Sequence, residues 1–405
     1  MQYIQVEQPT TPRLSQRGLR LKSSGMRRAN ASMPTRCGVA NAPSERRHNL
    51  GGIAAALVAG MGAVVGSAHA GWTVIKLHPN HPGAISSFAE ATRGGKQAGK
   101  VWYQGDESAG WVATRWAGTA ASASALFSNG GSIAQGVDGV QYVGYQFLPG
   151  QRAMLWTNNG VGPANAVNLH PLGAGMSEIS AIDGGLKVGG VDDKAALWTA
   201  TNTWINLHPT GFMGSEALGV HGQIKVGMAY MSGPVSHAML WDAANNAIDL
   251  SPPGSLNSIL CACYGTQQVG RVEFPASPLR AYLWNGTPNG ISLHPANMYA
   301  SAALAAGNGA QAGWVQAALN GPYAAAIWFG TPNSYVNLGA MVPGFSDTFA
   351  TGVEKIGQQI WVSGWGVNTL ANNRVEALLW YYTKTIPLNP VARAVPATSG
   401  NELPE

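Results

Sequence analysis

The stretch that decides the fold is AQGVDGVQYVGYQFLPGQRAMLW, residues 134–156. It runs from small residues through Asp138-Gly139 into a Val-Gly strand, and then into an A-x-L-W strand that ends at Trp156. Asp-Gly favours a two-residue type I′ turn, because that turn needs positive φ at both central positions. The stretch therefore predicts consecutive antiparallel strands joined by short connections.

The same pattern recurs along the chain at a regular spacing. Its A-x-x-W element accounts for half of the 14 tryptophans, at Trp116, Trp156, Trp198, Trp241, Trp284, Trp328 and Trp380. The first and last are 264 residues apart over six intervals, so one unit is about 44 residues long. A glycine precedes each tryptophan, at Gly99, Gly144, Gly189, Gly227, Gly270, Gly313 and Gly364. A fourth strand ending in Leu, often as Leu-His-Pro, completes most units.

Four strands in a unit of this length are typical of a β-propeller blade. Small residues in the first strand suit the crowded axis of a propeller, and the tryptophans suit packing between blades. We predict an all-β, seven-bladed β-propeller over residues 71–390, with an open β-solenoid as the alternative. An extra V-x-L strand at 72–77 is expected to join the last blade, competing with or supplementing residues 386–388, and to close the ring.

The N-terminal region indicates export. Residues 1–70 hold nine Lys or Arg and two acids, whereas residues 71–405 hold 15 basic and 17 acidic residues. The apolar stretch 50–66 follows Arg46-Arg47 and leads to an A-x-A-type cleavage site at 67–70. We expect a basic extension at 1–49, with Met26 and Met33 as alternative starts, a signal-peptide region at 50–70, and a flexible tail at 391–405. The expected location is secreted, periplasmic or extracellular; a membrane anchor and a mitochondrial transit peptide are the alternatives.

Several function classes find no support in the sequence. The folded part has no basic excess, which argues against a nucleic-acid partner. No apolar run in the mature chain approaches the roughly 18–20 residues of a membrane span. Metalloprotease, P-loop, G-x-S-x-G and C-x-x-C motifs are absent, so we predict no cofactor, metal or catalytic set. Cys261 and Cys263, at i and i+2 of one strand, are expected to be buried thiols rather than a bridge.

The repeat resembles the HAF-type extracellular repeat family. That family combines an A-x-G-[IV]-N-x-x-G-Q-V-V-G turn with H-A-F-L-W, and this chain has Gly136–Gly144 followed by Ala153–Trp156, and His237–Trp241 in another copy. Only the copy at His237 keeps the histidine, and other residues replace the phenylalanine. The resemblance implies an exported bacterial repeat protein and no particular activity.

The repeated histidines are tempting as a metal site. His78, His170, His208 and His294 each follow a fourth strand, so the propeller would place one per blade on a single rim. Metal ligands must converge on one ion, at about 2.0–2.1 Å for zinc, whereas residues placed by blade periodicity diverge. We expect these imidazoles to satisfy backbone groups in the connection to the next blade. Asp138, Asp183 and His221 are likewise expected to be turn residues.

Departures from the repeat are the better candidates for a site, because function on a regular scaffold concentrates in irregular loops. Units one and seven carry the longest connections between the second and third strands, and closure would make them neighbours on one face. The candidate ligand-binding residues there are Trp102, Tyr103, Asp106, Glu107, Trp111, Trp365, Asn368 and Arg374. Aromatic rings beside polar groups are suited to stacking on sugars.

The sequence favours an exported scaffold that binds a protein or a glycan without catalysis. The alternative is a propeller hydrolase or lyase acting on polysaccharide, with Asp106 and Glu107 as the paired carboxylates. Acidic and histidine side chains gathered at the mouth of the channel would favour that enzyme.

Overall fold

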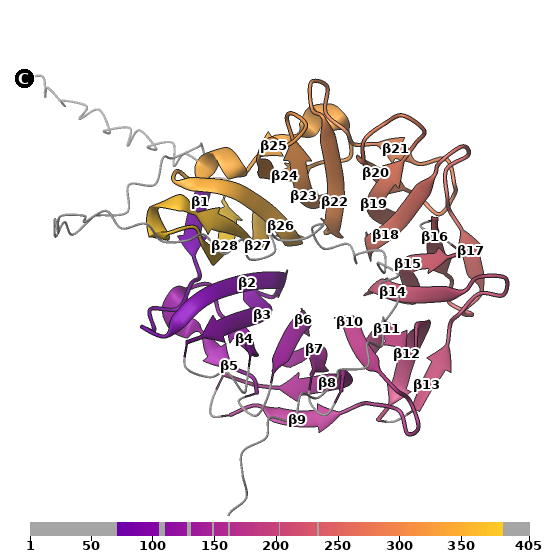
Figure 1. The fold of residues 1–405 in the computed structure, drawn as a ribbon, viewed down its shortest axis with the longest axis horizontal. Coiled ribbons are helices and arrows are strands. Elements are labelled where there is room, and N and C mark those ends of the chain that lie inside the picture. The colour runs from indigo at the N-terminus through magenta and orange to yellow at the C-terminus, as the bar shows by residue number, and fades with distance from the viewer. Residues whose placement is uncertain are drawn as a thin grey trace, which may run out of the picture. The chain divides into compact units, whose positions relative to one another are not determined.

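Small side chains in the first strand of every repeat let seven strands converge around one axis. The structure is a computed structural model and describes residues 71–104, 110–127, 131–147, 150–160, 163–201, 203–232 and 235–383. They form seven four-stranded antiparallel sheets, the blades of a β-propeller (Figure 1). The predicted fold class is confirmed. An open solenoid is excluded, because the last blade packs against the first.

Blades 1 to 6 are meanders in chain order, with the first strand nearest the axis (Figure 1). Blade 1 consists of β2 Ala84–Arg93, β3 Lys96–Tyr103, β4 Trp111–Trp116 and β5 Ser124–Ala125. Blade 2 consists of β6 Ser132–Asp138, β7 Gln141–Gln146, β8 Arg152–Thr157 and β9 Asn165–Asn168. Blade 3 consists of β10 Ser177–Asp183, β11 Leu186–Val191, β12 Lys194–Ala200 and β13 Thr203–Asn206. Blade 4 consists of β14 Gly214–His221, β15 Ile224–Tyr230, β16 Ser236–Trp241 and β17 Ala247–Asp249. Blade 5 consists of β18 Asn257–Tyr264, β19 Gln267–Glu273, β20 Arg280–Trp284 and β21 Ile291–Ser292. Blade 6 consists of β22 Ala300–Ala306, β23 Gln311–Gln316, β24 Tyr323–Trp328 and β25 Val336–Asn337. The short 3-10 helices are η1 Ala120–Ser122, η2 Pro332–Ser334, η3 Gly339–Met341 and η4 Thr369–Ala371.

Blade 7 joins the two ends of the described chain. Its inner strands are β26 Phe345–Ile356, β27 Gln359–Asn368 and β28 Arg374–Tyr382, and its outer strand is β1, Trp72–Lys76 (Figure 1). Strand β1 pairs antiparallel with β28, and Leu77 N–H donates to Ala377 C=O at 2.8 Å. The prediction that residues 72–77 join the last blade is confirmed. Residues 386–388 lie outside the described part of the chain.

A β-bulge in each inner strand explains the repeated glycine. In β10 the bulge lies between Ile179 and Ala181, and it brings the carbonyl of Glu178 against Gly189 of β11. A Cβ at Gly189 would lie 2.0 Å from Glu178 O, and the corresponding distance is 1.8–2.0 Å at all seven repeated glycines. Only glycine fits so close to a backbone carbonyl. The glycine therefore recurs at the same position of every unit.

The seven repeated tryptophans pack between blades, and none is more than 1% exposed. In four of them the indole N–H donates to the carbonyl of the leucine that ends the preceding blade. These bonds join Trp198 to Leu169 at 2.9 Å, Trp241 to Leu207 at 2.7 Å, Trp284 to Leu250 at 2.9 Å and Trp380 to Leu338 at 3.0 Å. The repeated tryptophan of one blade is thus hydrogen-bonded to the repeated leucine of the blade before it.

The repeated histidines are structural, as expected. In the connection between blades 2 and 3, His170 Nε2 lies 3.0 Å from Ala174 O, which can only accept, so Nε2 carries the proton. His170 Nδ1 then accepts from the Ser177 hydroxyl at 2.7 Å, and Ser177 Oγ accepts from Ala153 N–H of blade 2 at 3.0 Å. His78, His208 and His294 make the same contacts with a serine and a backbone carbonyl.

Acidification is expected to destabilise the ring through His78 and His294. Burial lowers the pKa of His78 and of His294 below the ordinary 6.5, and the charge of Arg374 adds to the effect at His78. As the pH falls below about 6.5, the unfolded chain takes up protons that the folded chain still refuses. The free energy of unfolding therefore decreases in this window. Urea unfolding at about pH 7.5 and about pH 5.5 measures the decrease, and His78→Gln with His294→Gln should reduce it. An unchanged decrease in the double variant would assign it to other groups.

Candidate functional site

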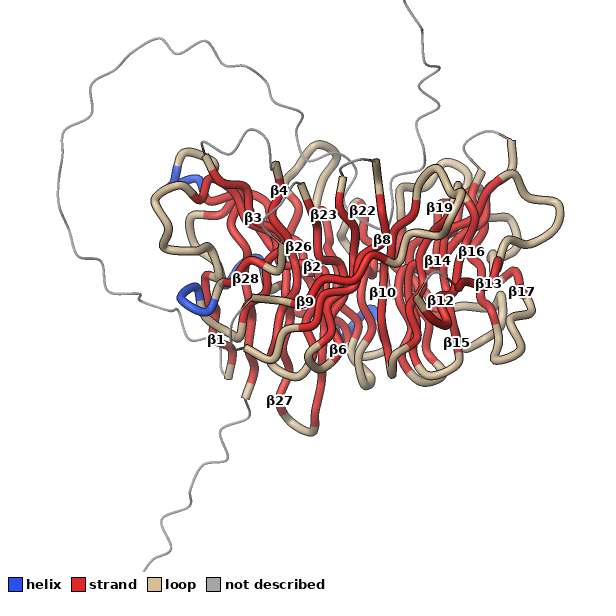
Figure 2. Tube along the Cα trace, turned by 90° about the horizontal axis from the view of Figure 1, so that it is seen from below, coloured by secondary structure: helices blue, strands red, loops and turns tan. Residues whose placement is uncertain are grey.

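The strand connections divide between two faces of the ring, which Figure 2 shows from the side. The loop face carries the connections from second to third strands and those from each blade to the next. The turn face carries the turns from first to second and from third to fourth strands. All of the described candidate residues lie at loop-face ends of strands in blades 1 and 7, the blades that meet at the closure.

The closure brings the predicted aromatic residues together. Trp102 and Trp111 lie opposite each other on β3 and β4, with ring centroids 5.1 Å apart and edge to face. Phe88 of β2 contacts Trp111 at 5.2 Å and Trp365 of blade 7 at 4.9 Å. Trp111 and Trp365 are therefore linked across the seam by a phenylalanine that the sequence did not single out.

The ring contacts continue into blade 6. Trp365 contacts Phe349 at 4.3 Å, Phe349 contacts Tyr323 at 5.1 Å, and Tyr323 contacts Trp314 at 5.0 Å. We call the resulting series of seven rings the seam aromatic chain; it comprises Trp102, Trp111, Phe88, Trp365, Phe349, Tyr323 and Trp314. Trp102 is 37% exposed, whereas Trp365 is 6% exposed. The seam aromatic chain therefore exposes its end in blade 1 to solvent, and the buried rings hold that end in place.

An ion pair lies beside the exposed end of the seam aromatic chain. Lys100 Nζ is 2.8 Å from Glu90 Oε1. The same ammonium lies 4.8 Å from the centroid of Phe88 and 5.5 Å from that of Trp111. Lys100 thus combines a carboxylate contact with cation–π contacts, which place a fixed positive charge against the two rings.

The other candidate residues have structural partners. Tyr103 packs edge-on against His81 at 5.3 Å, and burial raises the pKa of its hydroxyl. Asn368 Nδ2 donates to Glu376 Oε1 at 2.9 Å, and Arg374 donates to the same oxygen at 2.6 and 3.0 Å. Glu376 is 2% exposed, so Asn368 and Arg374 neutralise and solvate a buried carboxylate.

Asp106 and Glu107 lie outside the described residues, so their placement as paired carboxylates stays a prediction. The expectation of a long loop in unit seven is wrong: β27 and β28 extend to Asn368 and from Arg374, which leaves 369–373 between them, against 317–322 in blade 6. The extra residues lengthen the hairpin, because their side chains find cross-strand partners. Trp365 and Asn368 are consequently strand residues.

Acidic and histidine side chains do gather at the turn-face mouth of the channel. Arg93 of blade 1 pairs with Asp183 of blade 3 and lies 3.4 Å from Asp138 of blade 2. His221 Nδ1 is 3.7 Å from Asp183, whose other oxygen accepts from Gly222 N–H at 2.7 Å. Burial alone would raise the pKa of Asp183, but the Gly222 bond and Arg93 outweigh it and lower that pKa. The cluster connects blades through an ionised carboxylate, which is unsuited to act as a general acid.

Other chemistry finds no support in the described residues. In that part of the chain, no three His, Cys, Asp or Glu side chains are placed to hold a metal ion. None of its helices has the length and apolar character needed to cross a membrane. Cys263 is a buried free thiol and so is not bridged to Cys261, and burial raises its pKa to about 12. The expectation of a second buried thiol is wrong, because Cys261 is disulfide-bonded.

Comparisons with known proteins assign no family to this chain. No family model and no curated protein matches the chain. Among solved structures it is similar to a puromycin hydrolase S511A mutant complexed with PGG (11% identity, TM-score 0.47, 74% of this chain and 54% of that one). It is also similar to prolyl endopeptidases (10%, 0.48, 75% and 51%) and to the phage phi92 endosialidase (8%, 0.40, 82% and 71%). The chain spans about half the length of the hydrolase and peptidase structures.

Proposed function

We propose that this protein is an exported scaffold whose loop face binds a glycan or a protein. The observation that carries the proposal is the seam aromatic chain, which offers the exposed Trp102 beside Trp111 and the Lys100–Glu90 pair. Aromatic faces stack on the apolar faces of sugars, and the flanking charged side chains can form hydrogen bonds with sugar hydroxyl groups. Membership of the HAF-type repeat family and export by the N-terminal signal are parts of the same proposal.

The distribution of exposed apolar side chains also favours the loop face. Every blade has at least one there, including Trp102, Phe147, Leu172, Met213, Leu256, Leu319 and Leu370. Among the described turn-face residues, only Val140, Tyr264, Phe329 and Ile356 are large, apolar and exposed. Single exposed apolar residues are ordinary, but a ring of them on one face is typical of an interaction surface. Leu172 and Leu370, at 101% and 82% exposure, favour a protein as the second candidate ligand.

A polysaccharide hydrolase or lyase is not better supported. The carboxylates at the turn-face mouth are bound to Arg93 and to backbone N–H groups of the next blade. Asp183 is held ionised, whereas hydrolysis of a glycosidic bond needs one protonated carboxyl as the acid. The cluster therefore supports a structural role.

Glycan binding is expected to depend on the two exposed-end tryptophans. On a glycan array, Trp102→Ala and Trp111→Ala should each weaken binding of the wild-type ligands about tenfold or more, since a stacked ring contributes on the order of 1–3 kcal/mol. Phe329→Ala is the matched control, because Phe329 is also 37% exposed but lies on the turn face.

The outcomes separate the two ligands. Equal binding by wild type and both tryptophan variants would contradict the seam site. If the wild type binds no glycan, a random peptide library panned on it tests the protein candidate, with Leu172→Ser and Leu370→Ser as the variants expected to lose binding. Failure of both screens would contradict the scaffold proposal itself.

A further inference from the structure

Asn-Gly pairs recur in the turns of this protein. Asparagine is a thermolabile residue, and a following glycine, which has no Cβ, leaves the asparagine carboxamide open to attack by the next backbone nitrogen. A folded protein hinders this attack where it holds the glycine N–H in a hydrogen bond. The five pairs within the described residues are Asn159-Gly160, Asn285-Gly286, Asn289-Gly290, Asn308-Gly309 and Asn320-Gly321.

Four of these five glycine nitrogens are held by hydrogen bonds. The bonds run from Gly160 N–H to Asn158 Oδ1 at 2.7 Å, from Gly286 N–H to Gln268 Oε1 at 2.7 Å, from Gly290 N–H to Pro288 O at 2.9 Å and from Gly321 N–H to Ala318 O at 2.9 Å. Within the described part of the chain, Gly309 N–H has no acceptor. The Asn308-Gly309 pair is therefore the one whose nitrogen no hydrogen bond restrains.

Comparison with Asn285-Gly286 isolates the effect of the hydrogen bond. Both pairs are exposed and lie in turn-face connections, between β20 and β21 and between β22 and β23. Gly286 and Gly309 have φ of 75° and 73°, and apart from chain neighbours no atom lies within 4 Å of a Cβ built on either. The two pairs thus share exposure, open surroundings and backbone conformation, and they differ in the bond from Gly286 to Gln268.

We propose that Asn308 is a site of spontaneous deamidation in the folded protein. The Gly309 nitrogen gives its proton to solvent and bonds to Asn308 Cγ, while the Cγ–Nδ2 bond breaks and the side-chain nitrogen leaves as ammonia. Water then opens the resulting cyclic imide at Cγ, which gives aspartate, or at the main-chain carbonyl carbon, which gives isoaspartate. The net reaction consumes one water, releases one ammonia and replaces a carboxamide by a carboxylate.

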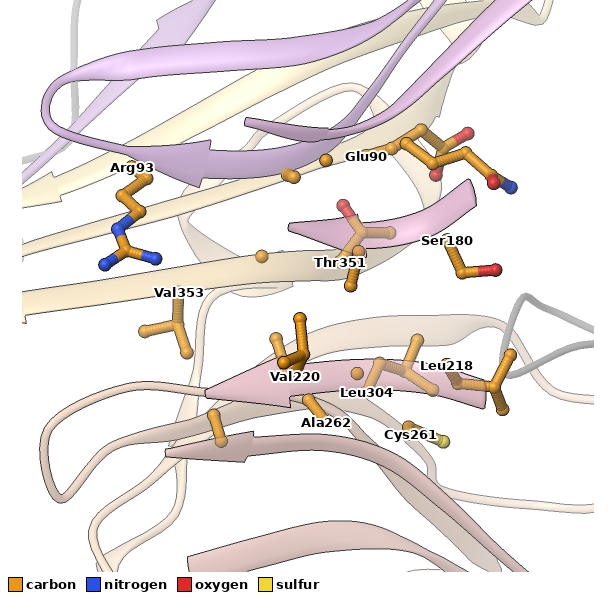
Figure 3. A pocket seen from close by; sticks show the side chains of 18 of the residues that line it. Glu90, Arg93, Ser180, Leu218, Val220, Cys261, Ala262, Leu304, Thr351 and Val353 are labelled. Atoms are coloured by element: carbon orange, nitrogen blue, oxygen red, sulfur yellow. The ribbon is translucent and has the colours of Figure 1, made fainter. Parts of the chain in front are cut away.

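The modified turn borders the central channel. Residues at the inner-strand bulges, such as Gln135 and Ser180, line this channel, which is a cavity of about 240 Å³ on the propeller axis (Figure 3). Val353 of blade 7 also lines it, and a Cβ built on Gly307 would lie 3.2 Å from Val353 O. Deamidation of Asn308 therefore adds a negative charge at the turn face. The seam aromatic chain lies at the loop face, so the inference is independent of the proposed binding function.

Incubation of the intact protein at mildly alkaline pH, followed by mass spectrometry of chymotryptic peptides, tests the proposal. Asn308 is expected to deamidate at least tenfold faster than Asn285, because a hydrogen-bonded nitrogen reacts only after local opening. Labelling by isoaspartyl methyltransferase should identify the isoaspartate product at position 308. In urea-unfolded protein the two rates should agree within about threefold, since the hydrogen bond to Gln268 is then lost.

Two matched variants examine the hydrogen bond directly. Gln268→Leu removes the acceptor of Gly286 N–H and should raise the deamidation rate of Asn285 at least fivefold, without changing that of Asn308. Gln97→Leu is the control, because Gln97 is also buried and accepts from Gly118 N–H at 2.9 Å, but no asparagine precedes Gly118. Near-ultraviolet circular dichroism verifies that both variants are folded.

The outcomes decide the proposal. It is overturned if Asn308 deamidates no faster than Asn285 in the folded wild type, or if the difference between them persists in urea. An unchanged Asn285 rate in folded Gln268→Leu, or an equal increase in Gln97→Leu, would also overturn it. The comparison of folded and unfolded wild type decides the matter even where a variant fails to fold.

Discussion

Replacing Gly189 by alanine is expected to lower the free energy of unfolding by at least about 3 kcal/mol. The new Cβ would lie 2.0 Å from Glu178 O, and the other close atoms belong to the backbone of Glu178 and Ile179. A flexible side chain could move aside, but here the inner strand itself must shift. That strand is held by its bulge and by the neighbouring blades. Urea unfolding, followed by tryptophan fluorescence, measures the loss.

The adjacent glycine is the control for this substitution. Gly190 lies in the same strand, and the nearest atoms to a Cβ placed there are 3.9 Å away. Gly190→Ala is expected to change stability by less than about 1 kcal/mol, in the stabilising direction, because alanine restricts the unfolded chain. Similar effects of the two substitutions would show that the carbonyl contact is not the reason for the repeated glycine.

Removal of β1 is expected to abolish the closed ring. A chain beginning at Pro79 lacks Leu77, which is fully buried, and uncovers the edge of β28 beside Trp380. The lost burial is several kcal/mol, comparable with the roughly 5–15 kcal/mol that stabilises a whole domain. We expect this chain to aggregate and to lose its near-ultraviolet circular dichroism, while a chain beginning at Gly71 keeps both solubility and signal.

A peptide supplied in trans sharpens the test. The peptide GWTVIKLH, residues 71–78, should restore the signal of the shortened chain, because it can occupy the vacant position beside β28. The same peptide with Val74→Pro should not, since proline is tolerated poorly within a paired strand. A shortened chain as stable as the reference would disprove closure by β1.

The blades could be predicted from sequence because their anchors are spaced regularly and each has a local cause. Trp198 needs an interblade cavity and Gly189 a close carbonyl, and neither depends on the rest of the ring. That Trp111 and Trp365 lie in neighbouring blades at the seam could be predicted from closure of the ring alone. The connecting Phe88, and Lys100 above it, could not be inferred, because their contacts lie across the seam and between adjacent strands.

The bulged residues that line the central channel could not be predicted from the sequence, for a different reason. A bulge adds one residue to a strand, so the alternation of side chains changes phase at that point. Gln135 and Ser180 therefore looked like ordinary members of small-residue strands. Aligning the seven units on their glycines would have revealed one variable position among Ala and Gly. Likewise, Trp365 and Asn368 looked like loop residues, because nothing local indicates that β27 extends to Asn368.

The pairing of β1 with β28 also dictates the order in which the molecule can be completed. Strand β1 is the first strand of the described chain to be synthesised, yet Tyr382, the partner of Trp72, is made some three hundred positions later. Until then the nascent chain is an open arc with an unpaired strand at its beginning and an exposed edge at its growing end. The last step of folding is therefore a long-range docking event that must wait for synthesis of the final blade.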